Sequence, residues 1–545
     1  MEIIGIVIAA IGIIIALYFG FRKPKGASEL ATNVKKIEAT LDRVTLYLDG
    51  LPETKDKNKK GLFEKGMSLM AEYKYEQAID SFRECLALET EGSGKSALLL
   101  LIGNCFYGRS KWDQALGRWK EALEQAQTAA DEKGQAAALG NLGMVFHDKG
   151  EWSKAIEFYD KSLEIEGKIG DEHGMAQTYN NLGLVYQDKG EWSKAIEFYD
   201  KSLEIKEKIG DEHGMARTFN NLGLVYQAKG EWDKAIEFYE KDLAISKKMG
   251  DEHGMAQTFN NLGLAYQDKG GWDKAIEFYE KALKGLEKIG DEHGMAATFN
   301  NLGLVYQDKG EWDKAIEFYE KALKGLEKIG DEHGMAQTFT NLGAVYQAKS
   351  EWDKAIGLHQ KALEGLEKIG DEHGMAAAYN NLGGVYLAKG EWSKAIEFYE
   401  KSLEIKRKIG DEHGMAQTYS NLGTVCQGTG EWDKAIEFYE KSLEIEGKIG
   451  GEHGMAQTYC NLGNVYQLEG EWSKAIEFYE KSLRINEKIG DEYGKAQTKA
   501  NIGVLYKAQG KIEQAKKLLE ESLKVLEKIG DKPSVEIVRK HLEDL

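Results

Sequence analysis

The sequence predicts an all-α protein in which tandem helix hairpins stack into a solenoid. A 40-residue unit repeats from Gly94 to about Gly530, and a fixed period of this length is typical of solenoids. Only three prolines occur against 62 glycines, so the helices run uninterrupted and the glycines are expected at helix ends or close helix contacts. No segment has a credible β-strand pattern.

The repeating unit divides into two amphipathic helices, as its clearest copy, residues 174–213, illustrates. Gly190 is expected to end the first helix at a tight turn, and Gly210 suits the position just past the second helix. Asp211 is placed to cap the next first helix. The predicted buried faces comprise Tyr179, Leu182, Gly183 and Tyr186 in the first helix, and Trp192, Ala195, Ile196, Tyr199 and Leu203 in the second.

The pattern L-G-x-x-Y…A-x-x-x-F/Y in this unit resembles the tetratricopeptide repeat family. Its signature positions are Leu182, Gly183, Tyr186, Ala195 and Tyr199. The usual Trp of the first helix is Tyr179, the usual Pro is absent, and the unit is longer than the common 34 residues. Such lengthened units resemble those of kinesin light chain and the G-protein-signalling modulator adaptors. The resemblance implies a right-handed α-solenoid of about twelve hairpins over residues 59–530, followed by a capping helix at 531–545.

The N-terminal region is predicted to contain a transmembrane anchor at residues 1–22. Ile3–Phe21 is uncharged and mostly apolar, and as a helix it would span about 28 Å, close to the thickness of a bilayer core. The basic residues Arg22, Lys23 and Lys25 follow, so the positive-inside rule predicts a single-pass membrane protein with its repeats in the cytoplasm. The alternative is a cleaved signal peptide, although its basic start and short apolar stretch are missing.

Residues 23–49 are predicted to form a juxtamembrane coiled-coil-like helix, and residues 50–58 a polar linker. Apolar residues at alternating spacings of four and three form a seam that favours a homo-oligomer, and small residues along Gly5–Gly20 favour close helix packing. The alternative is a single amphipathic helix packed on the membrane or on the first repeat. The seam residues are Leu30, Val34, Ile37, Leu41, Val44 and Leu48.

The resemblance implies that the first helices line a concave groove, faced in each unit by the positions of residues 177, 180, 184, 187 and 188. Asn and Gln recur at two of these positions, and each amide offers both a donor and an acceptor. We therefore expect an amide ladder that binds the backbone of an extended peptide. The predicted peptide-binding residues are Gln177, Asn180, Leu184, Gln187, Asn220, Leu224, Gln227, Asn260, Leu264, Gln267, Asn300, Leu304, Gln307 and Asn380.

Two features of the ladder leave alternatives open. Asn181 recurs in every unit from Asn141 to Asn501 and is expected to hydrogen-bond the adjacent unit, with a place in the ladder as the alternative. The units starting at Gly254 and Gly294 are nearly identical, so recent duplication also accounts for repeated amides. The position of Leu184 keeps Leu through Leu304 and then changes, which reflects either function or drift. The later residues at that position are Ala344, Gly384, Thr424 and Asn464.

The motif Asp-Glu-His-Gly is the strongest candidate for chemistry, and its position in the repeat argues against that role. It recurs once per unit, so neighbouring copies lie about 10–20 Å apart, too far to share one ion. We expect a helix start with acidic residues at its positive end. The cysteines lack metal-ligand spacing, and no phosphate-binding or nucleophile motif occurs. The net charge of −19 argues against nucleic-acid binding. The sequence predicts no enzyme, no metal and no cofactor.

The sequence therefore predicts a membrane-anchored scaffold or adaptor that binds segments of partner proteins in the concave groove. The expected partners are proteins or extended peptides, the membrane through the N-terminal helix, and further copies of the chain. The alternative is an exported or surface-facing solenoid for adhesion or envelope assembly, if the N-terminal segment is a signal peptide or inverts. A structural spacer without a binding partner is a third interpretation.

Overall fold

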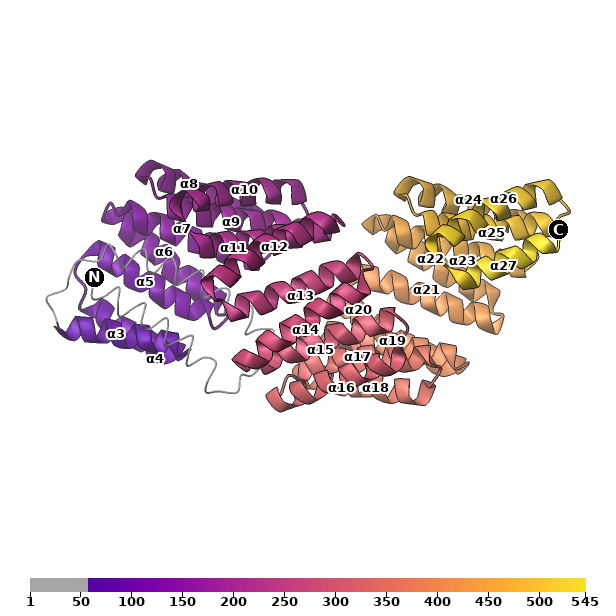
Figure 1. Cartoon of the computed structure of the whole chain (residues 1–545), viewed down its shortest axis with the longest axis horizontal. Helices are drawn as coiled ribbons and strands as arrows, with labels where there is room; N and C mark the ends of the chain where they lie inside the picture. Colours follow the sequence, from indigo (N-terminus) through magenta and orange to yellow (C-terminus); the bar gives the residue numbers. More distant parts are fainter. Residues whose placement is uncertain (1–56) are drawn as a thin grey trace. The chain divides into compact units, whose positions relative to one another are not determined.

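The computed structural model describes residues 57–545, which form 25 helices in twelve successive hairpins followed by one further helix (Figure 1). This described part contains no β-strand. The first helices are α3 (Lys57–Ala71), α5 (Gly92–Tyr107), α7 (Glu132–Asp148), α9 (Glu172–Asp188), α11 (Glu212–Ala228), α13 (Glu252–Asp268), α15 (Glu292–Asp308), α17 (Glu332–Ala348), α19 (Glu372–Ala388), α21 (Glu412–Thr429), α23 (Glu452–Leu468) and α25 (Glu492–Ala508). The second helices are α4 (Tyr75–Ala87), α6 (Trp112–Thr128), α8 (Trp152–Ile169), α10 (Trp192–Ile209), α12 (Trp232–Met249), α14 (Trp272–Ile289), α16 (Trp312–Ile329), α18 (Trp352–Ile369), α20 (Trp392–Ile409), α22 (Trp432–Ile449), α24 (Trp472–Ile489) and α26 (Ile512–Ile529). The all-α repeat solenoid expected from the 40-residue period is confirmed.

The chain divides into two compact units, Met1–Asp331 and Glu332–Leu545, here called the N-terminal and C-terminal units. The described hairpins of the N-terminal unit run from α3 to α16, and those of the C-terminal unit from α17 to α26. The last helix, α27 (Lys532–Glu543), packs on α26 and buries Val538 in the terminal apolar cluster.

Each hairpin closes on a large buried side chain that lies against a glycine, an aromatic ring in every hairpin except the last, where it is Leu519 against Gly503. Tyr199 of α10 is fully buried, and a Cβ added at Gly183 of α9 would lie 2.5 Å from its Cε1. The glycine is therefore required because only a bare backbone leaves room for the ring at this helix contact. Ala195, one turn before the tyrosine, is also fully buried. The same arrangement recurs through both units, which explains why the signature is repeated so strictly.

The turns follow from local backbone chemistry. Gly190 at the tip of the hairpin and Gly210 after α10 have φ values of +72° and +74°, the left-handed region that glycine adopts without strain. Asp211 then accepts a hydrogen bond from the Gly214 amide at 2.8 Å, as a helix N-cap does. The predicted capping role of Asp211 is confirmed. Ser350 stands where its counterparts have glycine and still adopts a φ of +59°.

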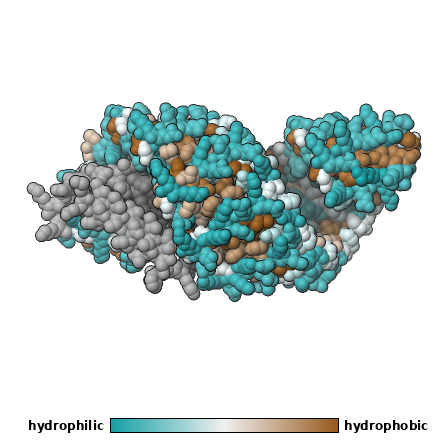
Figure 2. Space-filling model, in the orientation of Figure 1, coloured by the Kyte–Doolittle hydropathy of each residue, from teal (hydrophilic) through white to brown (hydrophobic). Residues whose placement is uncertain are grey.

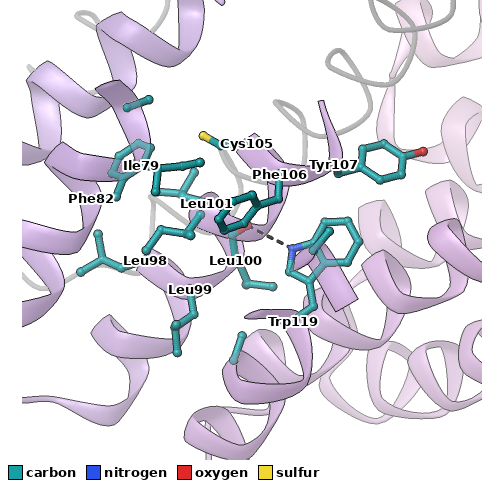
Figure 3. Close-up of a cluster of buried hydrophobic side chains, with 14 of the residues drawn as sticks. Ile79, Phe82, Leu98, Leu99, Leu100, Leu101, Cys105, Phe106, Tyr107 and Trp119 are labelled. Atoms are coloured by element: carbon teal, nitrogen blue, oxygen red, sulfur yellow. Dashed lines mark hydrogen bonds between the residues drawn. The ribbon is translucent and has the colours of Figure 1, made fainter. Parts of the chain in front are cut away.

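The first described hairpins contain a larger aromatic group. Trp119 of α6 takes the place of the buried tyrosine and donates a hydrogen bond from its indole Nε1 to the Leu100 carbonyl at 3.1 Å (Figure 3). Helix α5 supplies a run of buried apolar residues to the same cluster, together with Phe82 of α4. This end of the solenoid is therefore built on a more apolar helix than the later repeats.

Two core substitutions distinguish individual hairpins from the consensus. His359 of α18 replaces the buried tyrosine, is 1% exposed, and has no hydrogen-bond partner at either ring nitrogen among the described residues. Burial lowers the pKa of His359 to about 4. In the N-terminal unit, Asp242 of α12 is buried and accepts hydrogen bonds from Ser246 and Thr258. Burial nevertheless raises the pKa of Asp242 to about 6, because those hydrogen bonds only partly offset the lost hydration.

The localisation predicted from the sequence, a single-pass membrane protein with cytoplasmic repeats, is wrong on this structure. Within residues 57–545, no helix combines the length and apolar character that a bilayer crossing requires. The physical reason is that these helices have at most 18 residues and combine apolar with polar or charged side chains, as Glu172, Asn181 and Asp188 do in α9. The predicted anchor at 1–22, the coiled-coil-like helix at 23–49 and most of the linker lie outside the described residues.

Candidate partner-binding surface

The first helices of neighbouring hairpins lie side by side in each unit. In the N-terminal unit α7 contacts α9, α9 contacts α11 and α13 contacts α15, while hydrogen bonds join α11 to α13; in the C-terminal unit α19, α21, α23 and α25 contact one another in succession. One continuous surface therefore runs across the first helices. We call the surface made by the positions of residues 180, 184, 187 and 188 the first-helix face. It contains most of the peptide-binding residues predicted from the sequence.

The asparagines of this face are joined from repeat to repeat. Asn180 is 1% exposed, and its Oδ1 accepts hydrogen bonds from Thr218 Oγ1 at 3.2 Å and from Asn221 Nδ2 at 3.3 Å. The Oδ1 of Asn220 accepts from Asn261 Nδ2 at 2.7 Å in the same way. The structural role expected for the Asn181 position, a hydrogen bond to the adjacent unit, is confirmed. Other asparagines at the position of Asn180 also accept hydrogen bonds from the next repeat: Asn260 accepts from Thr298 at 3.0 Å and Asn380 accepts from Asn421 at 3.1 Å.

The glutamines are held at both ends of the side-chain amide. Tyr239 of α12 donates from its hydroxyl to Gln227 Oε1 at 3.0 Å, and Gln227 Nε2 donates to Asp268 Oδ2 of the next repeat at 2.6 Å. Gln267 repeats both bonds, with Tyr279 and with Asp308. Gln187 and Gln307 accept from Tyr199 and Tyr319. The side-chain amides of the ladder therefore already form hydrogen bonds within the solenoid, and their oxygens accept hydrogen bonds from neighbouring side chains.

The leucines form a second row on the same face. Leu264 is 38% exposed, and Leu184, Leu224 and Leu304 are half-buried. Figure 2 shows apolar patches on an otherwise mainly hydrophilic surface. Gln177, by contrast, is 6% exposed and contributes little to the surface. Among the predicted residues, the leucines thus present the accessible apolar area.

An acidic row lies one helical turn beyond the leucines, at the position of residue 188 that the resemblance places at the groove, although its aspartates are not among the predicted peptide-binding residues. Asp188, Asp268 and Asp308 are exposed and are the last residues of α9, α13 and α15. Asp188 Oδ2 lies 2.7 Å from His147 Nε2 of the preceding repeat. The sequence indicates this row because each aspartate follows Leu184, Leu264 or Leu304 by four residues, a spacing that places both side chains on the same helix face.

The C-terminal unit lacks both rows at the equivalent positions. Its residues in place of the leucines are Ala344, Gly384, Thr424, Asn464 and Val504, and in place of the acids they are Ala348, Ala388, Gly428, Leu468 and Ala508. Two of the new side chains turn to the buried tyrosine: Thr424 Oγ1 lies 3.1 Å from the Tyr439 hydroxyl, and the Tyr479 hydroxyl donates to Asn464 Oδ1 at 2.7 Å. The two units therefore present different surfaces on the same framework.

The Asp-Glu-His-Gly motif forms helix starts. Asp171, Asp251 and Asp291 each cap their helix through the amide of the glycine three residues later, at 2.9–3.0 Å. In the part of the chain that the structure describes, no group of three or more His, Cys, Asp or Glu residues is arranged to hold a metal ion.

The chain was compared with known proteins. Among solved structures, the apo form of RapI has 18% sequence identity and a TM-score of 0.50, covering 65% of this chain and 98% of RapI. BtubC (BKLC) from P. vanneervenii has 24% identity and a TM-score of 0.36, covering 41% of this chain and 91% of BtubC. No curated protein matches. The tetratricopeptide repeat model matches residues 94–166, 174–248, 254–328, 334–408, 374–448, 414–488 and 454–528. With matches over most of its length and hairpins closed by the glycine–tyrosine contact, the chain belongs to the tetratricopeptide repeat family.

Proposed function

We propose that this protein is an interaction scaffold that binds segments of partner proteins along the first-helix face of its N-terminal unit. Tetratricopeptide repeats are protein-interaction modules, and the family membership supports protein or peptide partners in general. The more specific assignment to this face rests on one observation. The leucine row keeps apolar area accessible, with Leu264 38% exposed and Leu184, Leu224 and Leu304 half-buried, whereas the positions of Ala176, Leu182 and Val185 are buried and Tyr186 stacks on Phe198.

In this proposal the Asn and Gln side chains do not bind the backbone of the partner directly, as the sequence predicted, but order the surface to which the partner binds. Because Asn220 accepts a hydrogen bond from Asn261 and Gln227 donates one to Asp268, these amides hold neighbouring first helices in register. A partner segment then meets a surface whose side chains are already ordered, which lowers the entropy cost of binding. We also propose that the protein acts by binding and has no catalytic activity, since its repeated acidic and histidine residues serve as helix starts.

Position-specific cross-linking tests the proposed face directly. A photo-crosslinking amino acid is placed at Leu264, on the first-helix face, and in a second variant at Glu277, an exposed residue of α14. We expect covalent adducts with a partner protein from position 264 and none from position 277 after irradiation in cells. Adducts from position 277 alone would assign binding to the second helices and overturn the proposal. Leucine positions are preferred to asparagine positions because Asn→Ala would also remove a hydrogen bond between repeats.

A further inference from the structure

The first-helix face of the N-terminal unit carries two parallel rows of different chemistry. The apolar row consists of Met144, Leu184, Leu224, Leu264 and Leu304, and the acidic row of Asp148, Asp188, Asp268 and Asp308. Members of the two rows are four residues apart on each first helix, so they lie one turn from each other on one side. Ala228 leaves one gap in the acidic row, on α11.

The acids of this row differ from those on the second helices in how their charge is compensated. Glu237, Glu277 and Glu317 on α12, α14 and α16 each form an ion pair with the lysine four residues later, at 2.6–2.7 Å. Asp268 and Asp308 instead accept a neutral amide hydrogen from Gln227 and Gln267. Within the described residues, neither of these two carboxylates has a lysine or arginine at ion-pair distance. Asp268 and Asp308 are thus ordered by hydrogen bonds from the preceding repeat and are not neutralised by a lysine or arginine, whereas Asp188 lies beside the His147 ring.

Positive side chains near this face are few or already engaged. The lysine that follows each first helix is turned toward other acids: Lys269 toward Asp233, and Lys309 toward Asp273 at 2.8 Å. A net charge of −19 for the chain adds to the negative potential. A surface of this kind attracts cations and repels acidic segments, and complementary charge selects partners and speeds their association.

We propose that this surface binds a cationic amphipathic segment of a partner protein, with apolar side chains against the leucine row and lysine or arginine side chains against the acidic row. The proposal rests on the proposed function and adds the chemistry of the partner. Neighbouring packed helices are about 8–10 Å apart, and a segment in the polyproline II conformation advances about 3.1 Å per residue with three residues per turn, so every third side chain faces the same side. The segment therefore carries one basic and one apolar residue in roughly every three, with the basic residue dispensable opposite Ala228.

The test uses fluorescein-labelled peptides of five triplets and fluorescence anisotropy with the full chain. The peptide of repeated Leu-Lys-Ser is expected to bind. The Leu-Glu-Ser peptide is expected not to bind, and the Ser-Lys-Ser peptide to bind at least tenfold more weakly. Equal binding of the acidic peptide overturns the proposal.

Two matched variants separate this face from the general acidity of the protein. The triple variant Asp188→Asn, Asp268→Asn, Asp308→Asn keeps an oxygen for the amide hydrogen bonds and is expected to bind the Leu-Lys-Ser peptide roughly tenfold more weakly, with less salt dependence. The control Glu237→Gln, Glu277→Gln, Glu317→Gln removes the same charge from the second helices and is expected to bind within twofold of the unmodified protein. An equal loss in both variants means that only bulk charge attracts the peptide and overturns the proposal.

A third variant distinguishes failure of this inference from failure of the proposed function. Leu224→Ser with Leu264→Ser removes apolar area at the centre of the row without touching the acids. Weaker binding in this variant, together with no effect of the Asp→Asn changes, leaves the first-helix face as the binding surface and overturns the charge selectivity. No effect of either set overturns both. Circular dichroism of each variant verifies that the helices and their melting are retained.

Discussion

The N-terminal and C-terminal units are built from the same hairpin. They differ at the positions whose residue type is not fixed by packing within the hairpin. In both, a glycine lies against a large side chain: Gly263 against Tyr279 and Gly343 against His359. The hydroxyl of Tyr279 donates to Gln267, as those of Tyr439 and Tyr479 in the C-terminal unit donate to Gln427 and Gln467, whereas His359 makes no such bond among the described residues. The comparison teaches that the packing positions set the fold. The hydrogen bonds made by the buried side chain differ between hairpins, and the adjoining surface differs between the two units.

The largest expected difference between the units concerns loss of this ring. Tyr279→Ala in α14 should destabilise the N-terminal unit by about 3–5 kcal/mol, because it empties a fully buried aromatic site and removes the partner of Gln267. His359→Ala in α18 should cost much less, since the smaller ring buries two polar atoms without hydrogen bonds. Chemical denaturation with hydrogen exchange in α13–α14 and α17–α18 measures both. Equal costs would show that the histidine packs as effectively as the tyrosine.

Acidification should weaken the C-terminal unit through His359. Its pKa in the folded state is about 4, below the ordinary value of 6.5, because burial penalises the charged ring. As pH falls from about 6.5 to about 4, the unfolded chain takes up the proton and the folded chain does not, so up to about 3 kcal/mol of stability is lost. Thermal melting of the protein and of His359→Tyr across this pH range measures the loss. The variant should lack it, and an unchanged profile would assign the pH dependence to other groups.

The N-terminal unit should respond to acid in the opposite direction through Asp242. The pKa of this buried carboxyl is about 6 against an ordinary 3.8, so the folded state binds the proton first as pH falls. Stability contributed by this group therefore rises by up to about 3 kcal/mol between about pH 6 and 3.8. Nearby Asp251 and His213 act in opposite senses on the same carboxyl. Asp242→Ser, the residue at the equivalent positions of several repeats, should abolish the gain when hydrogen exchange in α12–α13 is followed.

The smallest effect is expected at the hairpin tip. Ser350→Gly should stabilise the C-terminal unit by about 1 kcal/mol, since a φ of +59° is strained for serine and free for glycine. The reciprocal change Gly310→Ser, at a φ of +72° in the N-terminal unit, should cost a similar amount. Paired melting curves of the two variants provide the measurement. Melting shifts of the same sign would show that the tip conformation does not control these differences.

The sequence by itself determined the features that depend on local chemistry. The 40-residue period and the signature positions, among them Gly183 and Tyr199, predicted the hairpin, and the structure showed that these two residues pack against each other. Asp211 and Gly210 predicted the helix boundaries, because capping and left-handed turns involve only a few consecutive residues. The membrane location predicted from the N-terminal composition was wrong on the described residues, while the residues that motivated it lie outside them.

Only the tertiary structure decided how the surface positions are used. Asn220 and Gln227 look equally suited to a peptide backbone in the sequence, but each bonds a residue about 40 positions away that stacking brings alongside. Asp268 and Glu277 are both exposed acids, and only Glu277 has a lysine one turn away on its own helix. Whether a polar group is left to a partner depends on contacts between repeats, because its competitors for hydrogen bonds and charge lie in the next hairpin.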